Sequence, residues 1–164
     1  MEQYVIIGNG AAAVGCIEGI RSIDTTAKII VVSSEERHVY CRPLISYYLE
    51  GKTNLELMKY RPDDFYQINS CEVLYGKKAI KIDRENQLDI LDDGSSVEYS
   101  KLCVAAGSSP FVPPFEGLES VDKKFSFMTL EDALALEKAI NHESKVLIIG
   151  AGLIGLKCAE GLKE

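Results

Sequence analysis

The amino-acid sequence predicts an α/β protein with a parallel sheet, on two main observations. Short apolar runs such as Tyr4–Ile7 alternate with helical stretches, as in sheets that are covered on both faces. A glycine-rich turn follows this first run and returns late in the chain after a similar one, which indicates two units of the same kind. The composition agrees, because 164 residues with 46% hydrophobic and 26% charged side chains are ordinary for a globular protein.

The charge balance excludes some function classes. The formal net charge is −7, and phosphate groups attract basic surfaces, so we expect no nucleic acid and no membrane surface as partner. No apolar run reaches the roughly 20 residues of a transmembrane helix. Met1–Gln3 lacks the basic segment of a signal peptide, and no Cys-x-x-Cys pair is present. We therefore expect a cytoplasmic protein.

The first elements predict a βαβ unit. Tyr4–Ile7 reads as a buried strand, and Ala11–Ile20 as a helix with an apolar stripe at helical spacing. Lys28–Val32 is rich in β-branched residues and predicts the second strand. Ser33–Lys52 has no clear period and is expected to be mainly loop, with one helical turn near Ser46–Glu50.

The middle of the chain predicts short antiparallel strands. Pro62 opens a short helix, because proline is favoured in the first helical turn. Loosely alternating segments follow and predict an antiparallel β-meander inserted into the first unit: residues 71–75, 78–83, 87–91 and 96–99.

The C-terminal third begins with a predicted buried strand, Lys101–Ala105, followed by a proline-rich linker at 108–117. Thr129 and Asp132 have the spacing of a capping box, with Asp in the usual Glu or Gln position, before a predicted helix Leu130–Ile140. The segments Lys145–Ile149 and Leu153–Leu162 then predict one more buried strand and one more helix.

The two glycine turns have the spacing of dinucleotide-binding turns. In Gly8-x-Gly10-x-x-Ala13, the first glycine allows a tight strand-to-helix turn and the second lets a pyrophosphate approach the backbone. Ala13 is small enough for the helix to pack on the strand, and the phosphates would meet the helix N-terminus. For a single motif of this kind, the alternative interpretation is that its glycines only tighten the turn and bind no dinucleotide. The second copy, Gly150-x-Gly152-x-x-Gly155, favours two bound dinucleotides, and FAD with NAD(P)H is the obvious pair.

With these motifs the sequence resembles the pyridine nucleotide-disulfide oxidoreductase class of flavoproteins. It looks most like NADH:rubredoxin reductases and the N-terminal flavin part of the nitrite reductase large subunit. The resemblance implies a Rossmann-like FAD-binding domain at 1–114 and the start of a second Rossmann-like, NAD(P)-binding domain at 115–164. On this basis we expect a truncated chain that alone would not hold FAD tightly or catalyse.

The resemblance also implies which residues bind each cofactor. The post-strand acid for the adenosine ribose is Glu35, although many relatives place the carboxylate at Ser34. Tyr40–Leu44 resembles the family's Y-x-R-P-x-L loop beside the flavin. The FAD-binding residues are then Gly8, Gly10, Ala11, Ala12, Ala13, Ser34, Glu35, Arg42, Pro43, Ala79, Ala105, Ala106 and Gly107. The NAD(P)-binding residues are Gly150, Gly152, Leu153, Ile154 and Gly155.

The sequence departs from the family's pattern at three positions. Tyr47 stands where many relatives have a lysine that contacts the flavin. Phe111 replaces a common basic residue. Lys157 stands where a glutamate usually lies near the nicotinamide, which reverses the charge.

The cysteines divide into two kinds. Cys16, Cys103 and Cys158 lie in apolar runs, where a free cysteine usually behaves as a small buried hydrophobe. Cys41 lies among basic neighbours that favour its thiolate, and it is the only candidate for a catalytic residue. Neither His38 nor His142 has further ligands at a suitable spacing, so we expect solvated side chains and no metal site.

The leading hypothesis is an FAD-dependent NAD(P)H oxidoreductase that passes hydride from NAD(P)H to flavin. Electrons would then reach an acceptor protein (rubredoxin-like or a nitrite-reductase centre) or a small acceptor such as oxygen. One alternative is an NADH oxidase or thiol-disulfide reductase that uses Cys41. Another is a non-catalytic flavin-binding module for redox sensing or electron relay. The sequence leaves open the acceptor, the choice of NADH or NADPH, and the oligomeric state.

Overall fold

The computed structural model describes residues 2–163, which form two compact units. The first unit runs to Tyr40 and resumes with Lys59–Gly107. The second consists of Cys41–Met58 and the chain from Ser108 onward. This division concerns compactness alone, and the assignment of residues 1–114 to FAD and 115–164 to NAD(P) stays a prediction.

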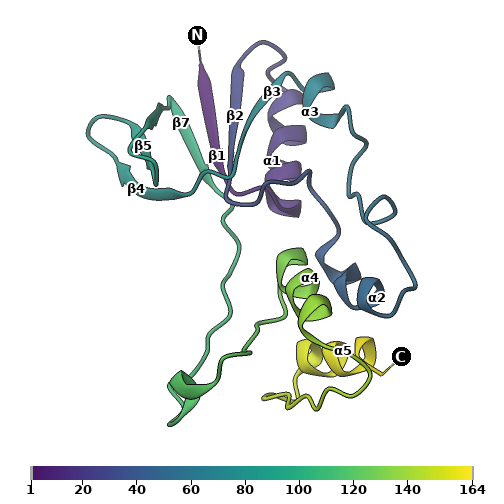
Figure 1. Ribbon diagram of the computed structural model, residues 1–164. Coiled ribbons are helices and arrows are strands. Elements are labelled where there is room, and N and C mark those ends of the chain that lie inside the picture. The colour runs from purple at the N-terminus through teal and green to yellow at the C-terminus, as the bar shows by residue number, and fades with distance from the viewer. Residues whose placement is uncertain (1, 164) are drawn as a thin grey trace. The chain divides into compact units, whose positions relative to one another are not determined.

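A four-stranded parallel sheet forms the centre of the first unit (Figure 1), in the order β3-β2-β1-β7. Its strands are β1 (Gln3–Ile7), β2 (Lys28–Ser33), β3 (Cys71–Tyr75) and β7 (Lys101–Val104). The helix α1 (Ala11–Arg21) connects β1 to β2, so the predicted βαβ unit is confirmed. Because β1 lies inside the sheet, its apolar residues have strand neighbours on both sides.

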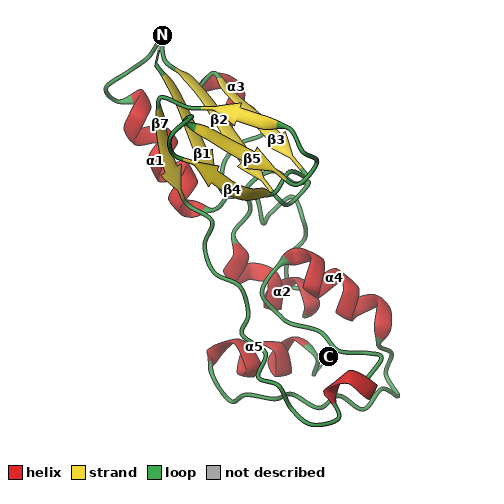
Figure 2. Ribbon diagram, turned by 90° about the vertical axis from the view of Figure 1, so that its left-hand side faces the viewer, coloured by secondary structure: helices red, strands yellow, loops and turns green. Residues whose placement is uncertain are grey.

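The sheet is covered on both faces, which explains the apolar runs. On one face, Ile6 and Val31 pack in one core cluster with residues of α1 and α3 (Phe65–Ile68). On the other face, Val5 and Val32 pack against an antiparallel sheet in the order β4-β5-β6 (Figure 2). The strands of this second sheet are β4 (Ala79–Asp83), β5 (Leu88–Leu91) and β6 (Ser96–Glu98).

The second unit is helical in the part of the chain described. It contains the 3₁₀ helices η1 (Arg42–Leu44) and η2 (Leu118–Ser120) and the α-helices α2 (Ile45–Leu49), α4 (Leu130–Ala139) and α5 (Leu153–Gly161). The short α2 packs against both α4 and α5. The predicted capping box is confirmed, because Thr129 Oγ1 accepts from the Asp132 amide at 3.1 Å and Asp132 Oδ2 accepts from the Thr129 amide at 2.9 Å.

Two predicted elements are wrong. Residues 71–75 do not belong to the antiparallel meander but form β3, an edge strand parallel to β2. Loose alternation suits either place, because an edge strand has a less buried face. Residues 145–149 do not form a strand, and Leu147 is 85% exposed. A strand needs a neighbour for its backbone hydrogen bonds, and none of the described strands pairs with this segment.

Among the described residues, no helix is both long enough and apolar enough to cross a membrane.

Candidate dinucleotide-binding sites

The first glycine turn joins β1 to α1 against the end of β7. Gly8 has φ +108°, and a Cβ built on it would lie 2.2 Å from the carbonyl oxygen of Ala105. Its amide donates to the Val32 carbonyl at 2.8 Å, and the Ala105 amide donates to the Ile7 carbonyl at 2.7 Å. Position 8 therefore has room for glycine only, and the ends of three strands meet at this turn.

The N-terminus of α1 is open to a ligand. Gly10 is the N-cap residue, and a Cβ at this position would meet no atom within 4 Å. Ala11 and Ala12 are exposed, whereas Ala13 is fully buried against the sheet. No acidic residue lies in the first turn, so the positive end of the helix dipole is not neutralised there. These features fit the pyrophosphate of a dinucleotide.

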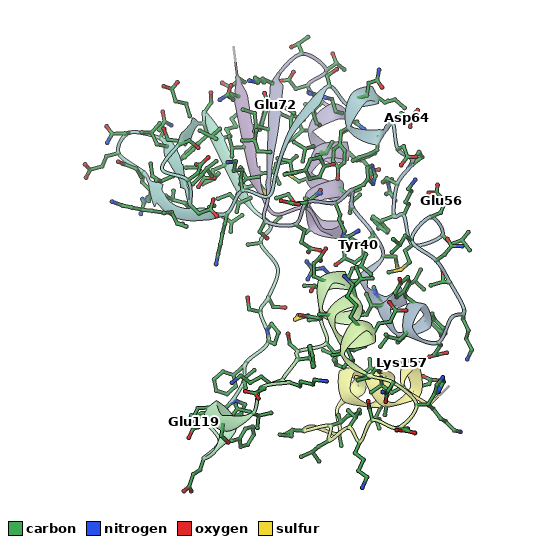
Figure 3. All side chains as sticks on the ribbon, in the orientation of Figure 1. Tyr40, Glu56, Asp64, Glu72, Glu119 and Lys157 are labelled. Carbon is green, nitrogen blue, oxygen red and sulfur yellow. The ribbon has the colours of Figure 1, made fainter. Side chains whose placement is uncertain are left out.

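The predicted ribose-binding acid lies just past the end of β2. Glu35 is half-buried, and its carboxylate accepts a hydrogen bond from the Tyr40 hydroxyl at 2.8 Å. The Ser33 hydroxyl donates to the Glu35 carbonyl at 2.8 Å, which fixes the turn that carries this side chain. Ser34, the other predicted position, is exposed. Figure 3 marks Tyr40 at the end of this segment.

The remaining predicted FAD residues lie in three places. Ala105, Ala106 and Gly107 follow β7, at the same edge of the sheet as Gly8. Ala79 begins β4 and packs against the core between the two sheets. Arg42 and Pro43 are exposed in η1 and belong to the second unit.

One residue of the turn was not predicted to contribute. Asn9 occupies the variable position between Gly8 and Gly10, and its Oδ1 accepts from the Tyr66 hydroxyl at 2.5 Å. Its Nδ2 donates to the Arg37 carbonyl at 3.3 Å. An amide side chain can both donate and accept hydrogen bonds, and this property was the only feature of the sequence that pointed to a role for Asn9. Asn9 thus ties the turn to α3 and to the loop after β2.

The second glycine turn, like the first, brings a glycine close to a backbone carbonyl, but here the carbonyl belongs to the turn itself. A Cβ on Gly155 would lie 2.0 Å from the carbonyl oxygen of Gly150, so the third glycine is required where α5 crosses its own turn. Gly152 is the N-cap of α5, with open space around it and no acidic residue in the first turn. Leu153 and Ile154 are exposed at this N-terminus. The arrangement again fits a dinucleotide pyrophosphate.

Two of the departures from the family's pattern meet in the second unit. The Lys157 ammonium lies 5.0 Å from the centroid of the Tyr47 ring. Lys157 also pairs with Glu160 at 2.5 Å, and this hydrogen bond raises the pKa of Lys157. Figure 3 labels Lys157 on α5. The third departure, Phe111, is 85% exposed in the linker.

The other candidate residues have simpler surroundings. Cys41 is half-buried, and its amide donates to the Met58 carbonyl at 2.7 Å. His38 is not the solvated residue that we expected, because its ring lies 4.9 Å from that of Tyr66 and its Nε2 is buried without a hydrogen-bond partner. Within residues 2–163, no group of three or more His, Cys, Asp or Glu could hold a metal ion.

Comparison with known proteins agrees with these features. The sequence profile of the family described as pyridine nucleotide-disulphide oxidoreductase matches residues 2–164. The chain is 36% identical over 166 residues to the assimilatory nitrate reductase electron transfer subunit of Bacillus subtilis, covering 99% of this chain and 21% of that protein. It is 34% identical to the nitrite reductase [NAD(P)H] of the same organism, covering 98% of this chain and 20% of that protein.

Among solved structures, the chain resembles NADH:rubredoxin oxidoreductase from Clostridium acetobutylicum. The TM-score is 0.80 at 25% identity, over 97% of this chain and 41% of that one. The expected fold class and the expected relatives are therefore confirmed. The chain spans between about a fifth and two fifths of the length of these three proteins.

Proposed function

The chain belongs to the pyridine nucleotide-disulphide oxidoreductase family, and we propose that it carries the FAD-binding and NAD(P)H-binding turns of an FAD-dependent NAD(P)H oxidoreductase. One observation carries this proposal. Two glycine turns in separate units, each leading into a helix, combine a glycine that no other residue can replace with an open helix N-terminus. An enzyme that moves a hydride between two dinucleotides needs two such sites.

The residues of the first unit would bind and orient FAD. The amides at the start of α1 would hold its pyrophosphate, where Gly10 leaves room for the phosphates. Glu35, held by Tyr40, would accept hydrogen bonds from the adenosine ribose hydroxyls. Asn9 would keep the turn in place through Tyr66. FAD, when bound, supplies hydride acceptance and one-electron transfer.

The second unit would contribute the NAD(P)H pyrophosphate site at the N-terminus of α5. Gly152 leaves the space that the phosphates need, and the close approach of Gly155 to Gly150 fixes the turn. Arg42 and Pro43 would contact FAD from η1, as the resemblance implies. With these residues as binders, no side chain of the chain is required as an acid or a base.

We propose a cytoplasmic protein that delivers electrons to an acceptor protein or to a small acceptor. The solved relative named NADH:rubredoxin oxidoreductase supports a small redox protein as acceptor. The net charge of −7 supports the absence of nucleic acid among the partners. The cysteines, all of them free, support a reducing compartment.

Flavin binding by matched variants tests the proposal. The purified full-length protein is titrated with FAD, and binding is followed by quenching of flavin fluorescence. Gly10→Ala should weaken FAD at least tenfold, because its methyl group enters the space of the pyrophosphate. Gly19→Ala is the control, because its methyl group also meets nothing within 4 Å but lies on α1 away from the turn. Equal affinity of these two variants would contradict the proposed site.

NAD(P)H turnover is tested separately, by anaerobic bleaching of the bound flavin with NADH and with NADPH. If the Gly152→Ala substitution slows this bleaching, the result supports a dinucleotide-binding site at the second glycine turn. The position of Lys157 favours one other function, a flavin-binding relay without NAD(P)H turnover, because an ammonium repels the cationic ring of oxidised nicotinamide. Tight FAD binding without bleaching by either nucleotide would favour the relay.

A further inference from the structure

The first glycine turn contains the only Asn-Gly sequence of the chain, Asn9-Gly10. Asparagine is a thermolabile residue, because the backbone nitrogen of the next residue can attack its side-chain amide carbon. A side chain on that next residue hinders the attack, and glycine has none. The other asparagines are each followed by a residue with a side chain: Asn54, Asn69, Asn86 and Asn141. Asn9 is therefore the asparagine most prone to deamidation.

The structure leaves the nucleophile of this reaction accessible. A Cβ built on Gly10 would meet no atom within 4 Å, and the backbone of Gly10 is extended, with φ −105° and ψ −168°. Among residues 2–163, no hydrogen bond has the Gly10 amide as its donor. Water can reach the same place, because the next residues, Ala11 and Ala12, are exposed. The backbone nitrogen and the water that deamidation needs are thus both available at this turn.

Contacts with two other segments restrain the Asn9 side chain. Its Oδ1 accepts from the Tyr66 hydroxyl of α3 at 2.5 Å, and its Nδ2 donates to the Arg37 carbonyl after β2 at 3.3 Å. Closure of a ring onto Gly10 moves the amide carbon toward the backbone and makes it tetrahedral. Both hydrogen bonds oppose this movement, because they fix the position and orientation of the amide. The turn therefore contains a reactive sequence that its neighbours hold back.

We propose that Asn9 is a modification site, at which the first glycine turn slowly loses its side-chain amide by deamidation. The Gly10 nitrogen loses its proton and bonds to Asn9 Cγ, the Cγ–Nδ2 bond breaks, and ammonia leaves with that proton. Water then opens the resulting succinimide ring. Addition of water at Cγ gives aspartate, and addition at the backbone carbonyl carbon gives isoaspartate. In total, one water is consumed and one ammonia is released, with no change of oxidation state.

Both products should damage the pyrophosphate site, a consequence that rests on the proposed function of the turn. A carboxylate at position 9 adds a negative charge that repels bound phosphates. It also cannot donate to the Arg37 carbonyl, as the amide does. Isoaspartate lengthens the backbone between Gly8 and Gly10 by one atom, so the spacing that the pyrophosphate requires is lost. We therefore expect conversion to weaken FAD roughly tenfold or more.

Peptide mapping of the purified full-length protein tests the proposal. The protein is incubated at mildly alkaline pH and digested at acidic pH, and mass spectrometry follows the change from amide to acid at each asparagine. An isoaspartyl methyltransferase assay detects isoaspartate. The Asn9 peptide should convert roughly tenfold faster than the Asn69 peptide, because only Asn9 precedes a glycine. Asn69 is the matched comparison within the same molecule, since its Nδ2 also donates to a carbonyl, that of Phe65 at 2.8 Å.

Two variants separate the reaction from its restraint. Gly10→Ala should slow the conversion of Asn9 about tenfold, because the new methyl group hinders attack by the nitrogen. Tyr66→Phe should speed the conversion roughly threefold to tenfold, because one restraining hydrogen bond is lost. The proposal is overturned if Asn9 converts no faster than Asn69, or if either substitution leaves its rate unchanged.

The effect on FAD binding is measured independently. Asn9→Asp forms the aspartate product directly and should weaken FAD roughly tenfold, whereas Asn86→Asp adds the same charge in an exposed turn and should leave FAD binding unchanged. Rapid deamidation with unaltered FAD affinity of Asn9→Asp would contradict the proposed pyrophosphate site and support the modification site. A stable Asn9 amide with weakened FAD binding by Asn9→Asp would overturn the modification site and support the pyrophosphate site.

Discussion

The ammonium of Lys157 and the ring of Tyr47 face each other at 5.0 Å in the second unit. They meet because α5 packs on α2, and the approach is close enough that a Cβ on Gly161 would lie 3.0 Å from Leu49 Cβ. The two positions are those at which the resemblance implies a lysine and a glutamate. Here the positive charge comes from α5, and an aromatic face lies opposite.

This relationship predicts how the protein distinguishes oxidised from reduced nicotinamide. Lys157→Glu should tighten NAD⁺ roughly three- to tenfold relative to NADH, because a carboxylate attracts the cationic oxidised ring. The ratio of the two dissociation constants, measured by titration, checks this. Lys163→Glu makes the same change of net charge on an exposed residue and should leave the ratio unchanged. A ratio that follows net charge alone would contradict a local effect of Lys157.

We predict that even the smallest substitution at Gly8 destabilises the folded protein severely. In Gly8→Ala the new methyl group would lie on the Ala105 carbonyl, and φ +108° is strained for alanine. We expect a loss of more than about 2 kcal/mol in the free energy of unfolding, measured by denaturant titration. Gly19→Ala on the exposed side of α1 should be neutral or stabilising. An unchanged stability of Gly8→Ala would be incompatible with this turn.

Tyr66 is predicted to act on FAD through Asn9. Tyr66→Phe removes the hydroxyl that donates to Asn9 and should cost about 1 kcal/mol of stability. It should also weaken FAD by roughly threefold to tenfold, because the glycine turn loses an anchor. Tyr75→Phe on β3 is the control and should leave FAD binding unchanged. In an ultraviolet pH titration of the unchanged protein, Tyr66 should ionise late, because burial raises its pKa to about 12.

Because of the buried Asp89 carboxyl group, we predict that the stability of the folded protein falls as the pH rises. It is fully buried in β5, both carboxylate oxygens lack a hydrogen-bond partner, and burial raises its pKa above the ordinary 3.8. The folded protein then holds a proton that the unfolded chain releases, so the stability present below pH 3.8 is lost as the pH rises through the raised pKa.

The substitution Asp89→Val should therefore stabilise the protein at pH 8 by about 1–3 kcal/mol, with a smaller gain at about pH 3.5, below the ordinary pKa of 3.8. Denaturant titrations at the two pH values measure both gains. Glu98→Gln, an exposed change in the neighbouring strand β6, should have little effect at either pH. Equal gains at about pH 3.5 and at pH 8 would show that the carboxyl group does not titrate between these pH values.

Local sequence determined the first unit to a large extent. The run Tyr4–Ile7, the stripe on α1 and the run Lys28–Val32 each have the period of the element that they form, and such patterns depend on near neighbours. The capping box at Thr129 was predictable for the same reason. The prediction of a strand at 145–149 was wrong. An apolar run does not show whether a neighbouring strand is present to pair with it, and none of the described strands pairs with this segment.

For this protein, the sequence by itself determined the two glycine turns, the strand and helix around the first turn, the helix after the second turn, and the pair of dinucleotides for which their spacing is suited. Only the tertiary structure decided which distant residues meet: Gly8 with Ala105, Asn9 with Tyr66 and Tyr47 with Lys157. The physical reason is that spacing along the chain fixes local backbone geometry, whereas contacts between distant side chains depend on how the elements pack.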